Sequence, residues 1–187
     1  ESGSGKELVA AALQRLSTNS KAPFIVFNCA AISPHLLEAA LFGHAKGAYT
    51  GANQAQAGFF EDAGEGILFL DEIGDMSALI QGKVLRLLQE QRFERVGGND
   101  VIQTNVRIIA ATHQDLEERV KNGLFREDLF HRLNVIRLRL PALRERREDI
   151  PLLIKHFLQH SATELGVEAK QPSVAALKYL SAVNWSG

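Results

Sequence analysis

Short apolar runs alternate with stretches of helical periodicity along the first 140 residues. The runs at residues 24–27, 66–70 and 106–111 are continuous, which is typical of strands buried on both faces of a parallel sheet. Between them, apolar residues recur every three or four positions, and this spacing predicts amphipathic helices. The predicted helices cover residues 7–16, 33–42, 77–91, 115–122 and 127–133.

Glycine-rich segments separate some of these elements. Residues 43–58 are rich in Gly and Ala and predict a loop or an interrupted helix. Two short strand-like runs at 93–96 and 101–103 flank a Gly-Gly-Asn-Asp sequence, which predicts a β-hairpin. A last strand is expected at residues 135–140, where Pro141 ends the pattern.

Beyond Pro141 the periodicity is helical only. Helices are expected at residues 150–165, with Pro151 in the first turn, and at residues 173–183. Strands that alternate with helices predict a parallel sheet sandwiched by helices. We therefore expect an α/β domain over residues 1–140 and a partial helical lid over residues 141–187.

Composition and charge narrow the function classes. The chain of 187 residues carries 21 basic and 22 acidic side chains, a net charge of −1, which does not indicate a broad nucleic-acid-binding surface. A DNA or polymerase partner would have to be held by local features. The single cysteine, Cys29, cannot form an internal disulfide, so a reducing compartment, the cytoplasm, is expected. No apolar run approaches the roughly 20 residues that span a membrane.

A phosphate-binding loop is indicated where the first predicted helix begins. Ser2-Gly3-Ser4-Gly5-Lys6 places glycines and a lysine at a helix N-terminus, where backbone N–H groups and the helix dipole favour phosphate. The general motif has a further Gly before Glu1 and Ser or Thr in place of Glu7, so a flexible Gly/Ser terminus is the alternative. The residues expected to bind ATP are Glu1, Ser2, Gly3, Ser4, Gly5, Lys6, Glu7 and Leu8.

Two carboxylates follow the second predicted strand. Asp71 and Glu72 come directly after residues 66–70, at the strand end where ligands bind in open α/β sheets. Asp71 could hold Mg²⁺ and Glu72 could polarise an attacking water, which favours ATP hydrolysis over binding alone. A solvated pair of acids at a strand end is the alternative.

The segment between these motifs carries a family resemblance. Leu41-Phe42-Gly43-His44-Ala45-Lys46 leads into a Gly-Ala-Tyr-Thr-Gly-Ala loop, and the chain resembles the central AAA+ domain, a P-loop NTPase, of bacterial sigma-54-dependent activators of the nitrogen regulatory protein C type. In that family the loop has Phe in place of Tyr, contacts sigma-54 and moves with the nucleotide cycle. The residues expected to contact sigma-54 are Gly47, Ala48, Tyr49, Thr50, Gly51 and Ala52.

The resemblance also implies roles for residues outside the two ATP motifs. Asn28 matches the residue that holds the catalytic glutamate, here Glu72, until the nucleotide state releases it. Thr112 lies at the nucleotide-sensing position with His113, where relatives often have Asn. Arg126 and Arg132 resemble arginines that reach into the neighbouring subunit's ATP. The hairpin at residues 94–99 resembles a second loop that supports the sigma-54 loop.

Other positions depart from the family. Phe59 stands where Arg is usual, Ala40 where Glu is usual, and residues 64–67 replace a usual Asp-Gly-Gly-Thr. The sensor II arginine of relatives falls beyond residue 187, and the strand before the phosphate loop falls before residue 1. We therefore expect the 187-residue piece alone to be inactive as an ATPase although its parent is active.

Together these features predict an ATP- and Mg²⁺-dependent ATPase that forms a ring, by resemblance a hexamer. It would remodel the sigma-54 RNA polymerase holoenzyme at its closed promoter complex. Promoter or enhancer DNA would be bound by other domains, in a two-component regulator. Two alternatives stay open, another AAA+ remodeller such as a helicase or chelatase subunit, and a nucleotide switch that does not hydrolyse ATP.

Overall fold

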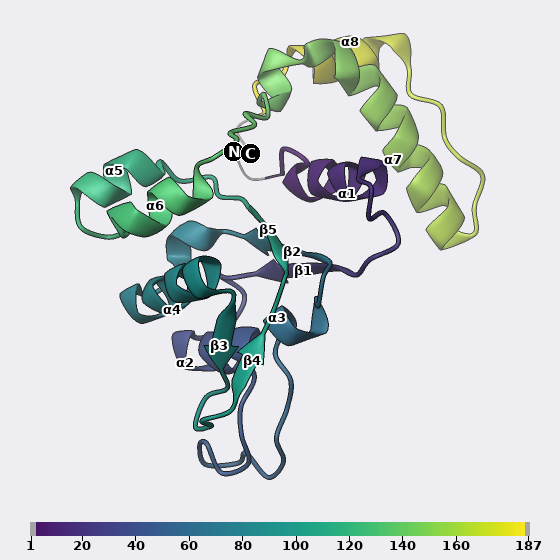
Figure 1. Ribbon diagram of the computed structural model, residues 1–187. Coiled ribbons are helices and arrows are strands. Elements are labelled where there is room, and N and C mark those ends of the chain that lie inside the picture. The colour runs from purple at the N-terminus through teal and green to yellow at the C-terminus, as the bar shows by residue number, and fades with distance from the viewer. Residues whose placement is uncertain (1–2, 186–187) are drawn as a thin grey trace. The chain divides into compact units, whose positions relative to one another are not determined.

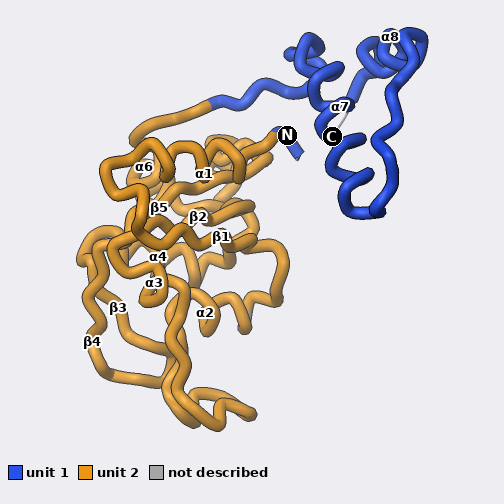
Figure 2. The backbone as a smooth tube through the Cα atoms, turned by 90° about the vertical axis from the view of Figure 1, so that its right-hand side faces the viewer, with its two compact units in different colours: residues 1–4, 139–187 blue, residues 5–138 orange. Residues whose placement is uncertain are grey.

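The computed structural model describes residues 3–185 of the chain (Figure 1). They divide into two compact units, one of residues 5–138 and one of residues 3–4 and 139–185 (Figure 2). The larger unit contains the sheet, and the smaller unit is helical.

A parallel sheet forms the centre of the larger unit. Its described strands are β1 (Phe24–Asn28), β2 (Ile67–Asp71) and β5 (Arg107–Ala110), in the order β1-β2-β5. Strand β2 lies in the middle and is buried from Ile67 to Leu70, because it is paired on both edges and covered on both faces. The structure confirms the predicted parallel sheet with helices.

Helices fill the connections between the strands, close to the predicted positions. The apolar periodicity explains this agreement. In helix α4 (Ala78–Glu90), for example, Ile80, Val84 and Leu87 recur on one buried stripe. Gln91 ends it in the left-handed conformation, with φ 54°. The other helices of this unit are α1 (Lys6–Leu16), α2 (Pro34–Phe42), the unpredicted single turn α3 (Phe59–Asp62), α5 (Leu116–Lys121) and α6 (Glu127–Leu133).

The predicted hairpin forms, and aromatic packing ties it to the core. Strands β3 (Arg92–Glu94) and β4 (Val101–Gln103) pair antiparallel. The ring of Phe93 lies 5.8 Å from that of Phe42 in α2 and 6.2 Å from that of Phe60 in α3. Such spacings are typical of favourable aromatic pairs, so the hairpin is fixed to two helices.

The prediction of a strand at residues 135–140 is wrong. This segment begins with a turn and forms no strand, and Val135 and Ile136 are 77% and 82% exposed. Strand propensity is expressed only where a neighbour accepts the backbone hydrogen bonds, and no strand of residues 3–185 lies alongside this segment.

The smaller unit contains the two helices predicted after Pro141. Helix α7 (Ile150–Leu165) has Pro151 in its first turn and ends at Gly166, whose φ of 65° suits glycine. Helix α8 (Val174–Ala182) begins at Ser173, whose hydroxyl accepts a hydrogen bond from the Ala176 N–H at 3.1 Å. Two 3₁₀ turns, η2 (Leu143–Glu145) and η3 (Arg147–Asp149), precede them. No described helix is long and apolar enough to cross a membrane.

Truncating the central strand should test this packing. Leu68 is 0% exposed, whereas Leu16, at the end of α1, is 86% exposed. We expect Leu68→Ala to lower the free energy of unfolding by about 2–5 kcal/mol, because it removes contacts and leaves a cavity. The matched control Leu16→Ala should change it by less than about 0.5 kcal/mol. Urea denaturation followed by circular dichroism measures both, and similar effects for the two variants would contradict the buried position of β2.

Candidate functional site

The phosphate-loop residues lead directly into α1. Gly3 and Gly5 have φ values of 69° and 93°, which side-chain-bearing residues rarely adopt. Gly5 caps α1 with its backbone, and its carbonyl accepts the Val9 N–H at 3.1 Å. The first turn of an 11-residue helix opens at Lys6, and the N-terminus of a helix favours an anion. Of the residues expected to bind ATP, Glu1 and Ser2 lie outside the described part of the chain.

Lys6 contacts the acidic end of strand β2. Its Nζ lies 3.2 Å from Oε1 of Glu72, and the two side chains are 15% and 11% exposed. An ion pair this far from water is little weakened by salt. The phosphate loop and the acidic strand end, 66 residues apart in sequence, thus form one site.

The backbone at Glu72 is strained. Its φ and ψ are 54° and 46°, a left-handed conformation that costs a residue with a side chain roughly 1–2 kcal/mol. Neighbouring hydrogen bonds hold it there, from the Ile73 N–H to the Ala111 carbonyl at 3.1 Å and from the Cys29 N–H to the Asp71 carbonyl at 2.9 Å. The turn directs Glu72 away from the line of the strand and toward the residues after β5.

Those residues supply the other partners of Glu72. Oε2 accepts hydrogen bonds from Thr112 Oγ1 at 3.3 Å, from the His113 N–H at 3.1 Å and from His113 Nδ1 at 2.8 Å. Thr112 thus contacts Glu72, and its role in sensing the nucleotide stays a prediction. The stronger contact of His113 was not predicted, because nothing in a local sequence pattern reports a contact across 41 residues.

Charge in this site follows from these contacts. Burial disfavours the charged form of Glu72, but the hydrogen bonds from His113 and Lys6 outweigh it, and the pKa of Glu72 lies below its usual value. Glu72 is therefore ionised at neutral pH. Burial, with the negative charges of Asp71, Asp75 and Glu72, raises the pKa of Cys29 to about 12, so its thiol stays protonated and unreactive.

Asn28 lies at the same edge of the sheet. It ends β1 in register with Asp71, and its side-chain oxygen accepts the Ala30 N–H at 2.8 Å. Asn28 is therefore paired with Asp71, the residue that precedes Glu72. Its amide oxygen is engaged in a local turn. Its role in holding Glu72 stays a prediction.

Arg132 lies on α6 and Arg126 is the N-cap residue of that helix, and both have other partners. Arg126 forms two hydrogen bonds with the exposed carboxylate of Asp128, at 3.0 and 2.7 Å. Arg132 donates to the Leu88 carbonyl at 2.9 Å. Both guanidinium groups are exposed, and the contacts around Lys6 and Glu72 are made by other residues. An exposed position is what a role in a neighbouring subunit requires.

The Gly47–Ala52 segment forms a closed turn. The Gly47 N–H donates to the Ala52 carbonyl at 2.8 Å, and the Ala52 N–H donates to the Tyr49 carbonyl at 3.0 Å. Thr50 is exposed, and the Tyr49 ring is 44% exposed and lies 5.0 Å from the ring of buried His44. The turn therefore presents a hydroxyl and part of an aromatic ring to solvent.

Backbone contacts join this turn to the hairpin. His44 pairs with Gln56 across the base of the loop, and the Ala45 N–H donates to the Val96 carbonyl at 2.9 Å. Gly97 packs so closely on Ala48 that an added Cβ would lie 2.8 Å from the Ala48 Cβ. The two loops are thus packed together, as the resemblance implies for a supporting second loop.

Comparison with known proteins identifies the family. A family model described as the sigma-54 interaction domain matches residues 1–139, and one described as the AAA+ ATPase lid domain matches residues 144–187. The chain belongs to the sigma-54 interaction domain family. Its predicted resemblance is confirmed.

Relatives of this sigma-54 interaction domain are similar over its whole length. DNA-binding transcriptional regulator NtrC of Klebsiella pneumoniae is 60% identical over 187 residues, which are 100% of this chain and 40% of that protein. Regulatory protein AtoC of Escherichia coli is 54% identical over 100% of this chain and 41% of its own. The chain thus spans about 40% of the length of these relatives.

Solved structures agree. A crystal structure of NtrX from Brucella abortus matches with a TM-score of 0.93 at 43% identity, covering 98% of this chain and 41% of that one. NtrX has also been solved in complex with ADP and with ATP, so a similar protein binds these nucleotides.

One family departure has a visible consequence in this sigma-54 interaction domain. Phe59, which stands where the resemblance implies Arg, places its ring 4.9 Å from that of Phe27 in β1. The substitution therefore exchanges a charge for aromatic packing against the sheet. Nothing in the structure explains Ala40.

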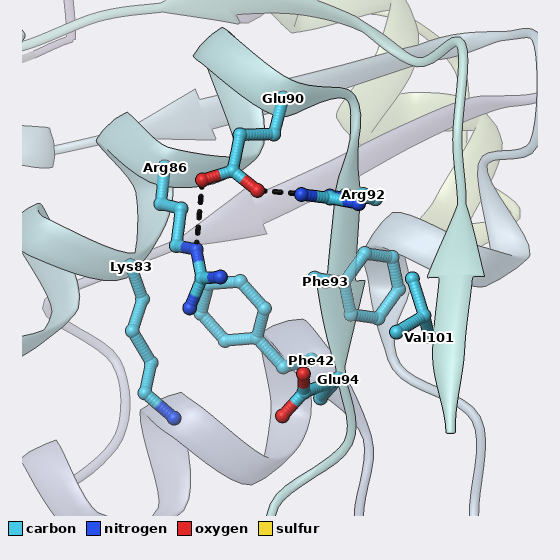
Figure 3. A pocket seen from close by; sticks show the side chains of 8 residues that line it. All are labelled: Phe42, Lys83, Arg86, Glu90, Arg92, Phe93, Glu94 and Val101. Carbon is cyan, nitrogen blue, oxygen red and sulfur yellow. Dashed lines mark hydrogen bonds and ion pairs between the residues drawn. The ribbon is translucent and has the colours of Figure 1, made fainter. Parts of the chain in front are cut away.

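A separate pocket of about 230 Å³ lies between α4 and the hairpin (Figure 3). Glu90, one of its lining residues, accepts hydrogen bonds from Arg86 at 2.9 Å and from Arg92 at 2.8 Å. Its lining shares no residue with the site around Glu72.

The base of the Gly47–Ala52 loop gives a prediction about glycine. An added Cβ on Gly58 would lie 2.2 Å from the Gly43 nitrogen, whereas one on Gly82 in α4 would meet nothing within 4 Å. We expect Gly58→Ala to destabilise the domain by about 1–3 kcal/mol, because the clash is with backbone. The control Gly82→Ala should stabilise it by about 0.5–1 kcal/mol. Urea denaturation compares them, and a harmless Gly58→Ala would mean that the loop base is not closed.

Proposed function

We propose that this chain is the ATP-hydrolysing domain of a sigma-54-dependent transcriptional activator that remodels the RNA polymerase closed complex to open promoter DNA. The observation that carries the proposal is the 3.2 Å contact between Lys6 Nζ and Glu72 Oε1. It brings a phosphate-binding lysine and a buried carboxylate together at a helix N-terminus, beside the end of a parallel strand.

ATP would bind along the loop from Glu1 to Leu8, with its phosphates on the backbone N–H groups that open α1. A γ-phosphate placed there offers Lys6 a multiply charged partner in place of Glu72. Lys6 would then move from the carboxylate to the phosphate. The ADP and ATP complexes of NtrX support nucleotide binding at such a domain.

The residues present fit a magnesium ion. Mg²⁺ is usually held by one or two carboxylates together with phosphate oxygens and water. Asp71 supplies a partly exposed carboxylate at the strand end, and residues 3–185 contain no cluster of three metal-ligating side chains that would form a complete protein cage. Asp71 would hold the ion, which neutralises charge that develops on the phosphates.

Glu72 would act as the base. Once Lys6 turns to the phosphate, Oε1 of Glu72 is free to accept a proton from a water molecule, while Oε2 keeps its partners. Loss of the lysine contact also removes one cause of the lowered pKa of Glu72, which makes the carboxylate a better base. Thr112 would orient the carboxylate through its hydroxyl, and Asn28 would hold Glu72 in another nucleotide state.

Arg126 and Arg132 would complete the site of a neighbouring subunit in a ring, by resemblance a hexamer. Guanidinium groups suit this role because they stay charged and bridge phosphate oxygens. Asp128, which now binds Arg126, is exposed, so little energy opposes the exchange of this partner for phosphate.

The Gly47–Ala52 turn would contact sigma-54. It is packed on the hairpin, so a shift in the hairpin would be passed to it through Val96 and Gly97. Enhancer or promoter DNA would be bound by parts of the longer protein, a two-component regulator of the cytoplasm, since NtrC-type relatives are more than twice the length of this chain.

Subunit mixing should test the hydrolytic site in the full-length parent protein. We expect Glu72→Gln to lower kcat by about 10²–10⁴-fold because it removes the base. Arg126→Ala should lower it by about 10³–10⁵-fold because it removes the arginine supplied in trans. In a mixed ring, an Arg126→Ala subunit supplies Glu72 and its Glu72→Gln neighbour supplies Arg126. Some sites are therefore complete, and the mixture should regain activity. A phosphate-release assay measures this.

The matched control is Arg137→Ala, which removes an exposed arginine paired with Glu117 and should leave kcat within about twofold of wild type. Normal hydrolysis by Glu72→Gln, or by Arg126→Ala with no dependence on assembly, would contradict the site. A parent that binds ATP without hydrolysis would instead be a nucleotide switch.

A second prediction concerns the partner. We expect Thr50→Ala to weaken binding of sigma-54 by about tenfold or more, because an exposed contact residue at the tip of the turn is lost. ATPase activity should stay within about twofold, since Thr50 lies outside the nucleotide site. Pull-down with sigma-54 in the presence of an ATP transition-state analogue measures binding. Gln54→Ala, an exposed neighbour, is the control, and full binding by Thr50→Ala would refute the assignment.

A further inference from the structure

The two oxygens of Glu72 have different partners. Oε1 accepts from one group, the Nζ of Lys6 at 3.2 Å. Oε2 accepts from two consecutive residues, through the Thr112 hydroxyl and through the backbone N–H and ring Nδ1 of His113. The bond from His113 Nδ1 is the shortest of these, at 2.8 Å.

We propose that His113 is the positioning residue that anchors Oε2 of Glu72, so that Oε1 alone is exchanged between Lys6 and the attacking water. The inference rests on the proposed ATP hydrolysis. It gives His113 a permanent contact with Glu72, whereas the resemblance implies for Asn28 a contact that the nucleotide state releases. The side-chain oxygen of Asn28 instead accepts the Ala30 N–H at 2.8 Å.

Two donors from one residue fix the direction of a carboxylate. A single hydrogen bond lets the group rotate about it, whereas Oε2 contacts two separate atoms of His113, the backbone nitrogen and ring Nδ1. Because a carboxylate oxygen only accepts, the proton of this contact lies on Nδ1. Thr112 adds less, since its hydroxyl contact is longer, at 3.3 Å, and its oxygen also accepts the Gln114 N–H at 3.1 Å.

The turn that carries His113 is itself held in place. The Ala111 N–H donates to the Leu70 carbonyl at 2.8 Å, which ties the turn to the strand that leads to Glu72. Gln114 Nε2 donates to Asp75 Oδ1 at 2.7 Å, and Gly74 packs closely on the Gln114 side chain. His113 is therefore presented from a backbone fixed on both sides, as positioning requires.

The chemistry then divides between the two oxygens. The oxygen of water forms a bond to the γ-phosphorus, and the bond from that phosphorus to the β,γ-bridging oxygen breaks, with its electron pair leaving on ADP. The proton lost by the water passes to Oε1 of Glu72 and afterwards to solvent or phosphate. Throughout, Oε2 keeps its bonds to His113, so the carboxylate stays aimed at the water.

Three substitutions of His113 in the full-length parent protein separate positioning from a general structural role. Asn carries a donor nitrogen on Cγ, as Nδ1 of histidine is carried, whereas Gln carries it one bond further out and Ala has none. We expect His113→Ala and His113→Gln to lower kcat for ATP by about 10–100-fold, and His113→Asn to retain at least about a third of it. KM should change by less than about twofold in all three.

His160→Ala, which changes an exposed histidine of α7, is the matched control and should leave kcat and KM unaltered. The His113 side chain is 48% exposed, so the substitutions should fold, and a thermal melt of each variant verifies this. Equal kcat for His113→Ala and wild type, a raised kcat, or equal loss in His113→Asn and His113→Ala would each overturn the proposal.

The proposed function can fail separately. If Glu72→Gln hydrolyses ATP like the wild type, the site itself is wrongly assigned. If Glu72→Gln is inactive while His113→Ala is fully active and Asn28→Ala is impaired, the site stands and only the role given to His113 is refuted.

Discussion

Strand β2 is buried along its apolar length, and its last residue, Asp71, and the following Glu72 lie at the carboxyl edge of the sheet. The rest of the site depends on this constraint. Glu72 turns through a left-handed conformation with little exposure, and a buried carboxylate must find donors. It finds Lys6 on one side and the residues after β5 on the other. Three segments far apart in sequence therefore meet because one charged group cannot stay unpaired.

A second part of the domain depends on close backbone packing instead of charge. Gly43 and Gly58 bring the two ends of the Gly47–Ala52 loop together, and Val96 and Gly97 tie the loop to the hairpin. Phe93 in turn packs with Phe42 and Phe60 in the core. The exposed turn is thus connected to α2, α3 and the hairpin by contiguous packing, which is the physical basis on which a change near the nucleotide could reach it.

The sequence predicts what is local and misses what depends on a distant partner. The continuous apolar run at residues 66–70 and the periodic apolar stripe of α4 are local patterns. The strand and the helix that they predict are both present. Residues 135–140 have a strand-like pattern too, but a strand also requires a neighbour, which no local pattern reports. Motifs predict the phosphate loop, Asp71 and Glu72 as parts of one site, and Lys6 does contact Glu72. The contact of His113 with Glu72 was not predicted, because it depends on how the turn after β5 faces β2.

The most direct measurement is a structure of the full-length parent protein with a bound ATP transition-state analogue. We expect Lys6 Nζ to leave Oε1 of Glu72 for the γ-phosphate position, and Oε2 to stay on His113. We also expect Arg126 or Arg132 of the adjacent subunit at the same phosphate. A nucleotide bound elsewhere, with the Lys6–Glu72 contact intact, would contradict the proposed site.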